Sequence, residues 1–276
     1  MNKKVIPVAT RWGSQPMGGE SYYLWESPTV RVWFGQQKKR LAIGFEYLED
    51  LSEQLPELSD NLAVIPEDID WHYCILDKKA TAIAILPVVA DKPILFNLET
   101  PVLMHPGASI SVYIELRTWL CFTDSSHLGK VIYEIPTVAL QKAWFGNSTT
   151  DGKVCYWRKE KAMFSPVETS NHPHIAVCPV TIYNRSKSPM NLDRIYLPTS
   201  RLSVFDTEQG LVTDRVQVSY TGCTEVSSVR VSGMAPPYAK SPVLLSRPRE
   251  STGTVQSVVA GAVNLFSKFN ELGDDD

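Results

Sequence analysis

Apolar and polar residues alternate along much of this chain, and the alternation predicts β-strands. The clearest case is Ser109–Arg117, in which apolar side chains occupy every second position. Those positions are Ile110, Val112, Ile114 and Leu116. Because successive side chains of a strand point to opposite faces of its sheet, this period of two predicts a half-buried strand. We expect one face of its sheet to lie in water.

Further short strands follow from the same pattern on both sides of this one. Residues 30–34 and 41–45 predict a hairpin around the polar turn 35–40. Five more short strands are predicted, at residues 175–184, 192–197, 201–205, 215–220 and 225–231. Short strands separated by Pro, Gly, Asn and Asp turns are typical of a sandwich rather than a parallel sheet.

The predicted fold class is therefore mostly β: one or two antiparallel β-sandwich domains with a short acidic helical insertion and a C-terminal amphipathic helix. A polar loop at 165–173 carries two prolines and is interpreted as a domain boundary. The expected domains are 1–165, a β-sandwich-like domain with the insertion at 46–69; 166–250, a second β-sandwich-like domain; and 251–276, the amphipathic helix and an acidic tail. The two β regions could equally form one continuous sandwich.

The insertion at 46–69 has the spacing of a helical face. Leucines recur in steps of three and four, at Leu48, Leu51, Leu55, Leu58 and Leu62, and every charged residue in the segment is acidic. Pro56 interrupts a continuous helix, so two short helices are predicted. We interpret the segment as a cover over one end of a sheet, and its alternative role is an acidic docking element for a basic partner.

The C-terminal segment 254–272 is predicted to be one amphipathic helix. Its apolar half contains the candidate partner-binding residues Val255, Val258, Val259, Ala262, Val263, Phe266 and Phe269. An isolated helix of this length is marginal in water, so other protein is expected to cover this face. Docking on the protein's own sheets, self-association, a separate protein partner and a membrane surface all remain open.

Composition narrows the classes of partner. The formal charge of −3 and the pI near 6.0 argue against a nucleic-acid or anionic-membrane binder. The five cysteines are widely spaced and mostly flanked by apolar or aromatic residues, which favours reduced thiols and a cytoplasmic location. The N-terminus lacks the apolar stretch of a signal peptide, and the most apolar window, 81–90, is too short to span a membrane. We expect no direct membrane insertion.

Candidate chemistry is sparse. His172, His174 and Cys178 offer ligand types that zinc uses, but no further ligand cluster lies nearby in sequence, so no metal site is predicted. His72 and Cys74 are two apart on a predicted strand and are interpreted as a core pair. No glycine-rich phosphate loop, nucleophile elbow or zinc-protease helix is present. The sequence therefore predicts no catalytic residue and no cofactor, and favours a non-enzymatic protein.

Aromatic residues cluster around a glycine in the middle of the chain. Trp144, Tyr156 and Trp157 are the candidate ligand-binding residues, because aromatic rings can stack on a small ligand or a sugar. The alternative is that these rings pack in a sandwich core or corner.

Three motifs in this part of the chain carry a family resemblance. They are Lys130-Val131-Ile132-Tyr133-Glu134-Ile135-Pro136-Thr137, Ala143-Trp144-Phe145-Gly146 and Gly152-Lys153-Val154-Cys155-Tyr156-Trp157. In this order they resemble the central signature of a prokaryotic domain-of-unknown-function family, number four-three-two. The resemblance spans residues 75 to 232. It implies no catalytic residue; some members are encoded beside small-conductance mechanosensitive channel proteins, which implies an accessory role near a membrane protein.

Two hypotheses follow. The first is a non-enzymatic cytosolic interaction or accessory module, with self-association or a protein partner such as a mechanosensitive-type membrane channel bound through the C-terminal helix. The second is a small-ligand or carbohydrate-binding β-sandwich, or a metal-dependent hydrolase that would use the His172, His174 and Cys178 group.

Overall fold

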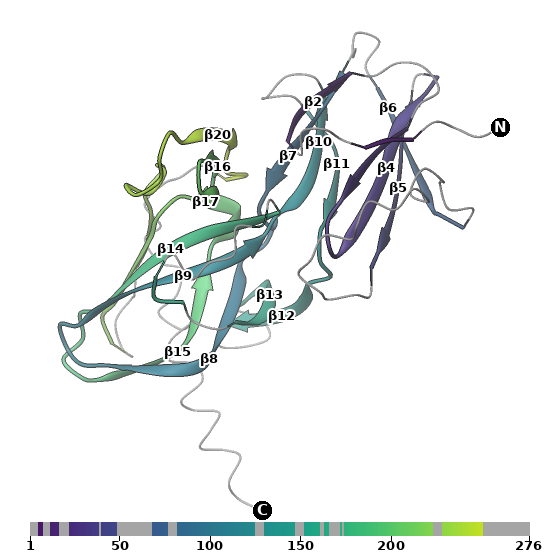
Figure 1. Cartoon of the computed structure of the whole chain (residues 1–276). Helices are drawn as coiled ribbons and strands as arrows, with labels where there is room; N and C mark the ends of the chain where they lie inside the picture. The colour runs from purple at the N-terminus through teal and green to yellow at the C-terminus, as the bar shows by residue number, and fades with distance from the viewer. Residues whose placement is uncertain are drawn as a thin grey trace, which may run out of the picture. The chain divides into compact units, whose positions relative to one another are not determined.

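The structure is a computed structural model of the 276-residue chain. The residues that it describes are 5–7, 12–16, 22–38, 40–48, 68–76, 82–124, 130–146, 152–160, 163–165, 172, 174–222 and 228–250. They are organised almost entirely as β-strands, which confirms the mostly-β prediction (Figure 1). The chain forms two compact units, residues 1–88 with 117–139 and residues 89–116 with 140–276. The linear division at residue 165 stays a prediction.

Unit 1 contains two described sheets. The first has the strand order β1-β3-β4-β5-β6 and the second has the order β11-β10-β7-β2. The strands of the first sheet are β1 (Val5–Pro7), β3 (Tyr22–Glu26), β4 (Val30–Gln37), β5 (Arg40–Tyr47) and β6 (Trp71–Ile75). The strands of the second are β2 (Gly13–Pro16), β7 (Ala82–Val88), β10 (Trp119–Asp124) and β11 (Val131–Pro136).

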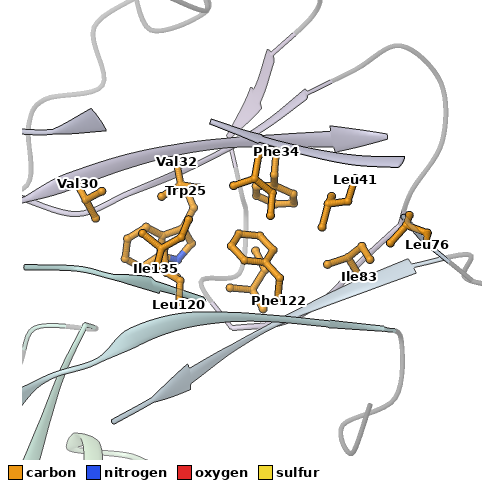
Figure 2. Close-up of a cluster of buried hydrophobic side chains, with 12 residues drawn as sticks. Trp25, Val30, Val32, Phe34, Leu41, Leu76, Ile83, Leu120, Phe122 and Ile135 are labelled. Carbon is orange, nitrogen blue, oxygen red and sulfur yellow. The ribbon is translucent and has the colours of Figure 1, made fainter. Parts of the chain in front are cut away.

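The core of unit 1 lies between these two sheets. Apolar side chains at alternate positions of both sheets face one another, and Figure 2 shows them as one cluster. Phe34 from β4 meets Phe122 from β10 edge to face, with ring centroids 5.3 Å apart, and both side chains are fully buried. Unit 1 is thus a β-sandwich whose core follows from the period of two in its strands.

The predicted hairpin at residues 30–45 is confirmed, with a tighter turn than expected. The pairing of β4 with β5 continues to Gln37 and Arg40, which leaves only two residues in the loop. Lys38 has φ of 59°. A two-residue hairpin turn needs residues with positive φ, so the turn geometry fits even though no glycine is present.

Unit 2 also contains two described sheets. One has the order β12-β13-β8-β15, and the other has the order β19-β18-β14-β17-β16-β20 with β9 paired to β14. The strands of the first are β8 (Ile94–Met104), β12 (Gln141–Gly146), β13 (Gly152–Glu160) and β15 (Met190–Leu197). Those of the second are β9 (Ser109–Arg117), β14 (Ile175–Asn184), β16 (Val204–Thr207), β17 (Gly210–Thr213), β18 (Val216–Tyr220), β19 (Ser228–Val231) and β20 (Val243–Ser246).

Asn184 fixes one end of unit 2. This side chain is fully buried and donates hydrogen bonds to the Met104 carbonyl (2.9 Å) and the Ser188 carbonyl (3.0 Å). Its Oδ1 accepts from the Ser186 backbone N–H (3.0 Å). It therefore joins the turn after β14 to the end of β8, a contact between segments far apart in sequence.

The expectation of purely antiparallel sheets was wrong. β14 runs parallel to both β17 and β18, β13 runs parallel to β8, and β1 runs parallel to β3. The strand that follows β14 along the chain is β15, and β15 joins the other sheet of unit 2. The later strands β17 and β18 then pair with β14 and run in its direction. The pattern of short strands and polar turns did not predict these parallel pairs. Whether two strands run parallel depends on whether an intervening strand joins another sheet, and the turns do not record this.

The predicted strand at 201–205 starts later than expected. Residues 199–201 form one turn of 3₁₀ helix, η3 (Thr199–Arg201), and the strand β16 begins at Val204. The Leu202 N–H donates to the Thr199 carbonyl at 3.0 Å, which closes that turn.

The two helical predictions are not supported by the described part of the chain. Glu46 and Tyr47, the first residues of the expected insertion at 46–69, continue strand β5, and Asp68 lies in a turn. Residues 49–67 lie outside the described residues, as does the C-terminal segment 251–276.

Candidate functional site

Unit 1 has an open edge where the last strand of each sheet lies beside the other. β6 is the edge of the first sheet, and β11 is the edge of the second. Between them is a groove of about 480 Å³, lined by Cys74, Ile75, Leu76, Asp124, Lys130, Val131 and Ile132. We call β6, β11 and this groove the open edge. Its volume lies within the range of ordinary binding sites, which are about 300–1,000 Å³.

Alternation along β6 directs one set of side chains inward and another outward. Cys74 packs against the unit 1 core from its margin. Ile75 and Tyr73 are exposed, with 84% and 49% of their surface accessible. No Asp, Glu, Lys or Arg occurs from Trp71 to Leu76. Among the described strands β6 pairs only with β5, so it combines an edge position with exposed apolar side chains, which natural edge strands usually avoid with charges, proline or bulges.

A bulge shapes the other wall of the groove. In the pairing of β10 with β11, Phe122 lies opposite Tyr133 and Thr123 lies opposite Val131, so Ile132 has no partner. The extra residue lets the consecutive side chains of Ile132 and Tyr133 both contact the core. Val131 is then left 52% exposed at the rim.

A ring stack connects the two walls. The His72 ring on β6 stacks on Tyr133 of β11, with centroids 5.1 Å apart and planes at 30°, and on Phe45 of β5, with centroids 5.6 Å apart and planes at 16°. Tyr47 adds a second link, because its hydroxyl donates to the Pro136 carbonyl at 3.1 Å. The groove is therefore held at a defined width by contacts between the sheets.

Two titratable groups in or beside the groove have raised pKa values. Burial raises the pKa of the Cys74 thiol, so the thiol and not the nucleophilic thiolate is present at neutral pH. Burial, and then the neighbouring Cys74, raise the pKa of Tyr133. Asp124 and Lys130 close one end of the groove with opposite charges, and the Asp124 backbone N–H donates to the Lys130 carbonyl at 3.4 Å.

The candidate ligand-binding aromatics are divided between two faces of their sheet. Trp144 lies opposite Val154 in the pairing of β12 with β13, and the alternation places it on the same face as Tyr156. Trp144 is 49% exposed, whereas Tyr156 is buried and donates its hydroxyl proton to Asp91 Oδ1 at 2.8 Å. Trp157 is on the other face, against the Leu95, Cys155 and Tyr196 cluster. Burial, and then the hydrogen bond to Asp91, raise the pKa of Tyr156.

Of the residues His172, His174 and Cys178, the two histidines have their rings close together. The rings of His172 and His174 lie 5.7 Å apart. Cys178 on β14 is fully buried, burial raises its pKa to about 12, and its Sγ–H points to the Asp214 carbonyl at 3.9 Å. Among the described residues, no group of three or more His, Cys, Asp or Glu side chains could hold a metal ion.

Sequence reasoning missed the open edge. It interpreted His72 and Cys74 as core residues and gave Tyr73, Ile75 and Val131 no role. The signal that could have found them is the charge-free run from Trp71 to Leu76 on a strand, because such a run is unusual at an exposed edge. The predicted contact residues Val255, Val258, Val259, Ala262, Val263, Phe266 and Phe269 lie outside the described residues.

A family model described as a protein of unknown function, DUF432, matches residues 11–262 of the chain. This match extends beyond the residues 75–232 that the sequence motifs covered. No curated protein and no solved structure significantly matches the chain. Within the described residues, no helix has the length and apolar character needed to cross a membrane.

Proposed function

Because this chain belongs to DUF432, a family of proteins of unknown function, we propose its role from its own surface: it is a non-enzymatic interaction module that contacts another protein through the open edge of unit 1. The observation that carries the proposal is the uncharged edge strand β6, with Ile75 84% exposed beside the groove. Covering one such isoleucine is worth about 2 kcal/mol, and the half-exposed Val131, which lines the same groove, adds to this surface.

The groove exposes polar and apolar surface in about equal parts, a balance that is typical of surfaces that contact protein. Its floor consists of a protonated thiol and aliphatic side chains, with only Asp124 and Lys130 as charged members. General acid–base catalysis needs a titratable group that lies next to the substrate and has a pKa near neutral pH. Peptide recognition at a sheet edge uses an edge strand and an adjoining pocket for side chains, and within the described residues β6 and the groove supply these two features.

The C-terminal segment extends the proposal. The apolar residues of this segment, from Val255 to Phe269, would form a second contact with a protein partner, with a mechanosensitive-type membrane channel as one candidate. The proposal assumes a cytoplasmic location, in keeping with the free thiols of Cys74, Cys121, Cys155 and Cys178.

Alkylation of Cys74 tests this function directly, because this thiol lines the groove. The rate of maleimide modification at Cys74, read by quantitative mass spectrometry, should be several-fold lower in intact cells than in the dilute purified chain. Ile75→Lys should remove the difference, because a lysine at the rim opposes apolar docking. Cys121, which is buried in the core, is the internal control and should react slowly in both states. Equal Cys74 rates in cells and in the purified chain would refute the proposal.

A small-ligand or carbohydrate site is the second candidate function. The observation that favours it is the exposed Trp144 ring on the same sheet face as Tyr156. Trp144→Ala should then abolish ligand-induced changes in tryptophan fluorescence across a panel of soluble sugars. A metal-dependent hydrolase built on His172, His174 and Cys178 has no comparable support, because Cys178 is fully buried with a raised pKa.

A further inference from the structure

We propose that the partner at the open edge is a second copy of this chain, with β6 pairing antiparallel to β6 of that copy about a two-fold axis at Tyr73. This inference rests on the proposed function and names the occupant of the same surface. The pairing would join the two β6-edged sheets into one sheet across the dimer.

The first support is the condition of the β6 edge. Within the described part of the chain, β6 pairs only with β5, in an unbroken register from Arg40 opposite Ile75 to Gly44 opposite Trp71. A regular antiparallel strand directs every second pair of backbone N–H and C=O groups away from its neighbour. β6 has no bulge in this register, no proline and no charged side chain to oppose another strand.

The second support is that β6 is complementary to itself. With Tyr73 on the axis, Trp71 faces Ile75 of the second copy, and His72 faces Cys74 of the second copy. Aromatic residues opposite β-branched residues are favourable cross-strand pairs, and no like charges meet. Tyr73 is the middle residue of β6, so only an axis at Tyr73 pairs all five residues of the strand with residues of β6 in the second copy. This centring selects the register.

The third support is that two-fold pairing covers the exposed β6 residues of both copies in one interface. A closed two-fold interface uses the same patch on both chains, so each exposed Ile75 is covered and both β6 edges are paired, while β1 remains the other edge of each sheet. A heterologous partner would need its own uncharged strand, whereas a second copy supplies one with the required register.

The oligomeric state of the full chain tests the pairing, with Val243→Lys as the matched control. Val243 is also an exposed apolar residue on an edge strand, β20, with 61% of its surface accessible. Light scattering over a dilution series should show a dimer for the native chain and for Val243→Lys. Ile75→Lys should raise the dimer dissociation constant by more than about tenfold, because the new charge enters the interface twice. Unchanged circular dichroism would show that Ile75→Lys folds.

A cross-link reports the register independently of stability. The two Cys74 residues would lie diagonally across the axis, at about 7–8 Å, within reach of a short bismaleimide. The native chain and Val243→Lys should give a Cys74-to-Cys74 linked dimer by peptide mapping, and Ile75→Lys should lose it. A native chain that stays monomeric at every concentration would overturn the pairing, as would a dimer unaffected by Ile75→Lys or cross-links that map elsewhere.

The two proposals fail in different ways. If the purified chain is monomeric but Cys74 is still protected from maleimide in cells, the β6–β6 dimer is refuted and the proposal of contact with another protein is retained. A monomeric chain whose Cys74 is unshielded overturns both.

Discussion

Replacing His72 tests whether the ring stack holds the two walls of the groove together. The His72 ring contacts Phe45 on one side and Tyr133 on the other, so His72→Ala removes two aromatic contacts. Each such pair is worth about 0.5–1.5 kcal/mol, so the free energy of unfolding of unit 1 should fall by about 1–3 kcal/mol. At a typical dependence on urea, the transition midpoint would drop by about 1 M.

His72→Phe is the matched control, because it keeps a flat ring without the imidazole nitrogens. Its urea midpoint, followed by tryptophan fluorescence, should stay close to that of the native chain. The maleimide reactivity of Cys74, the neighbouring groove residue, should rise in His72→Ala and not in His72→Phe. If His72→Phe were as destabilised as His72→Ala, stacking would not be the main contribution of this residue. If neither variant changed the midpoint or the Cys74 rate, the two walls would not depend on the stack.

Further substitutions test the sandwich core, a close packing contact and two buried polar groups. Phe122→Ala should lower the free energy of unfolding by about 3–5 kcal/mol, because the fully buried ring fills the space between the sheets in Figure 2; Phe122→Leu should cost clearly less in the same urea titration. Gly44→Ala should destabilise the chain, since a Cβ at residue 44 would lie 2.8 Å from Ile69 Cδ1, and adding Ile69→Ala should recover part of the loss in a double-mutant cycle. Asn184→Ala should cost about 2–3 kcal/mol by leaving the Met104 carbonyl without its side-chain donor, as measured by thermal unfolding. Burial raises the pKa of Asp214, so its contribution to stability should be most favourable below the ordinary aspartate pKa of about 4 and should fall as pH rises through the raised folded-state value; Asp214→Asn should remove that fall from urea midpoints measured between about pH 4 and pH 7.

Local periodicity was enough to predict that several segments are strands, whether their partners are near in sequence, as for β4 and β5, or far, as for β9 and β14. The hairpin of β4 and β5 and the strands Ser109–Arg117 and Ile175–Asn184 follow directly from alternating or continuous apolar positions. In Ser109–Arg117, three of the four expected inward positions, Val112, Ile114 and Leu116, are buried.

Long-range pairing was beyond this reasoning. The parallel pairs of β14 arise because the following strand, β15, pairs with β8 in the other sheet of unit 2, and no local sequence pattern predicts that pairing. The open edge is hidden for the same reason, since its two walls come from β6 and β11, which belong to different sheets. The bulge at Ile132 exists only as a shift in register with β10, so the sequence of β11 alone gives no sign of it.

The candidate ligand-binding aromatic residues show why the sequence alone could not predict a binding site. Trp144, Tyr156 and Trp157 are close in sequence, but consecutive residues of a strand face opposite sides, so Trp157 packs in a small core while Tyr156 bonds to Asp91. A cluster in sequence becomes a surface cluster only when its members share a face.

Photo-cross-linking from single positions tests the central claim, that the open edge contacts protein, more directly than any other measurement. A photoreactive amino acid would be placed in turn at Ile75 and Val131 on the open edge, and at Val243 and Leu103 as exposed controls in unit 2. We expect discrete protein adducts in cells from residues 75 and 131 and none from the two controls, with a second copy of this chain as the adduct partner. Adducts from the control positions alone, or from none of the four, would contradict the claim.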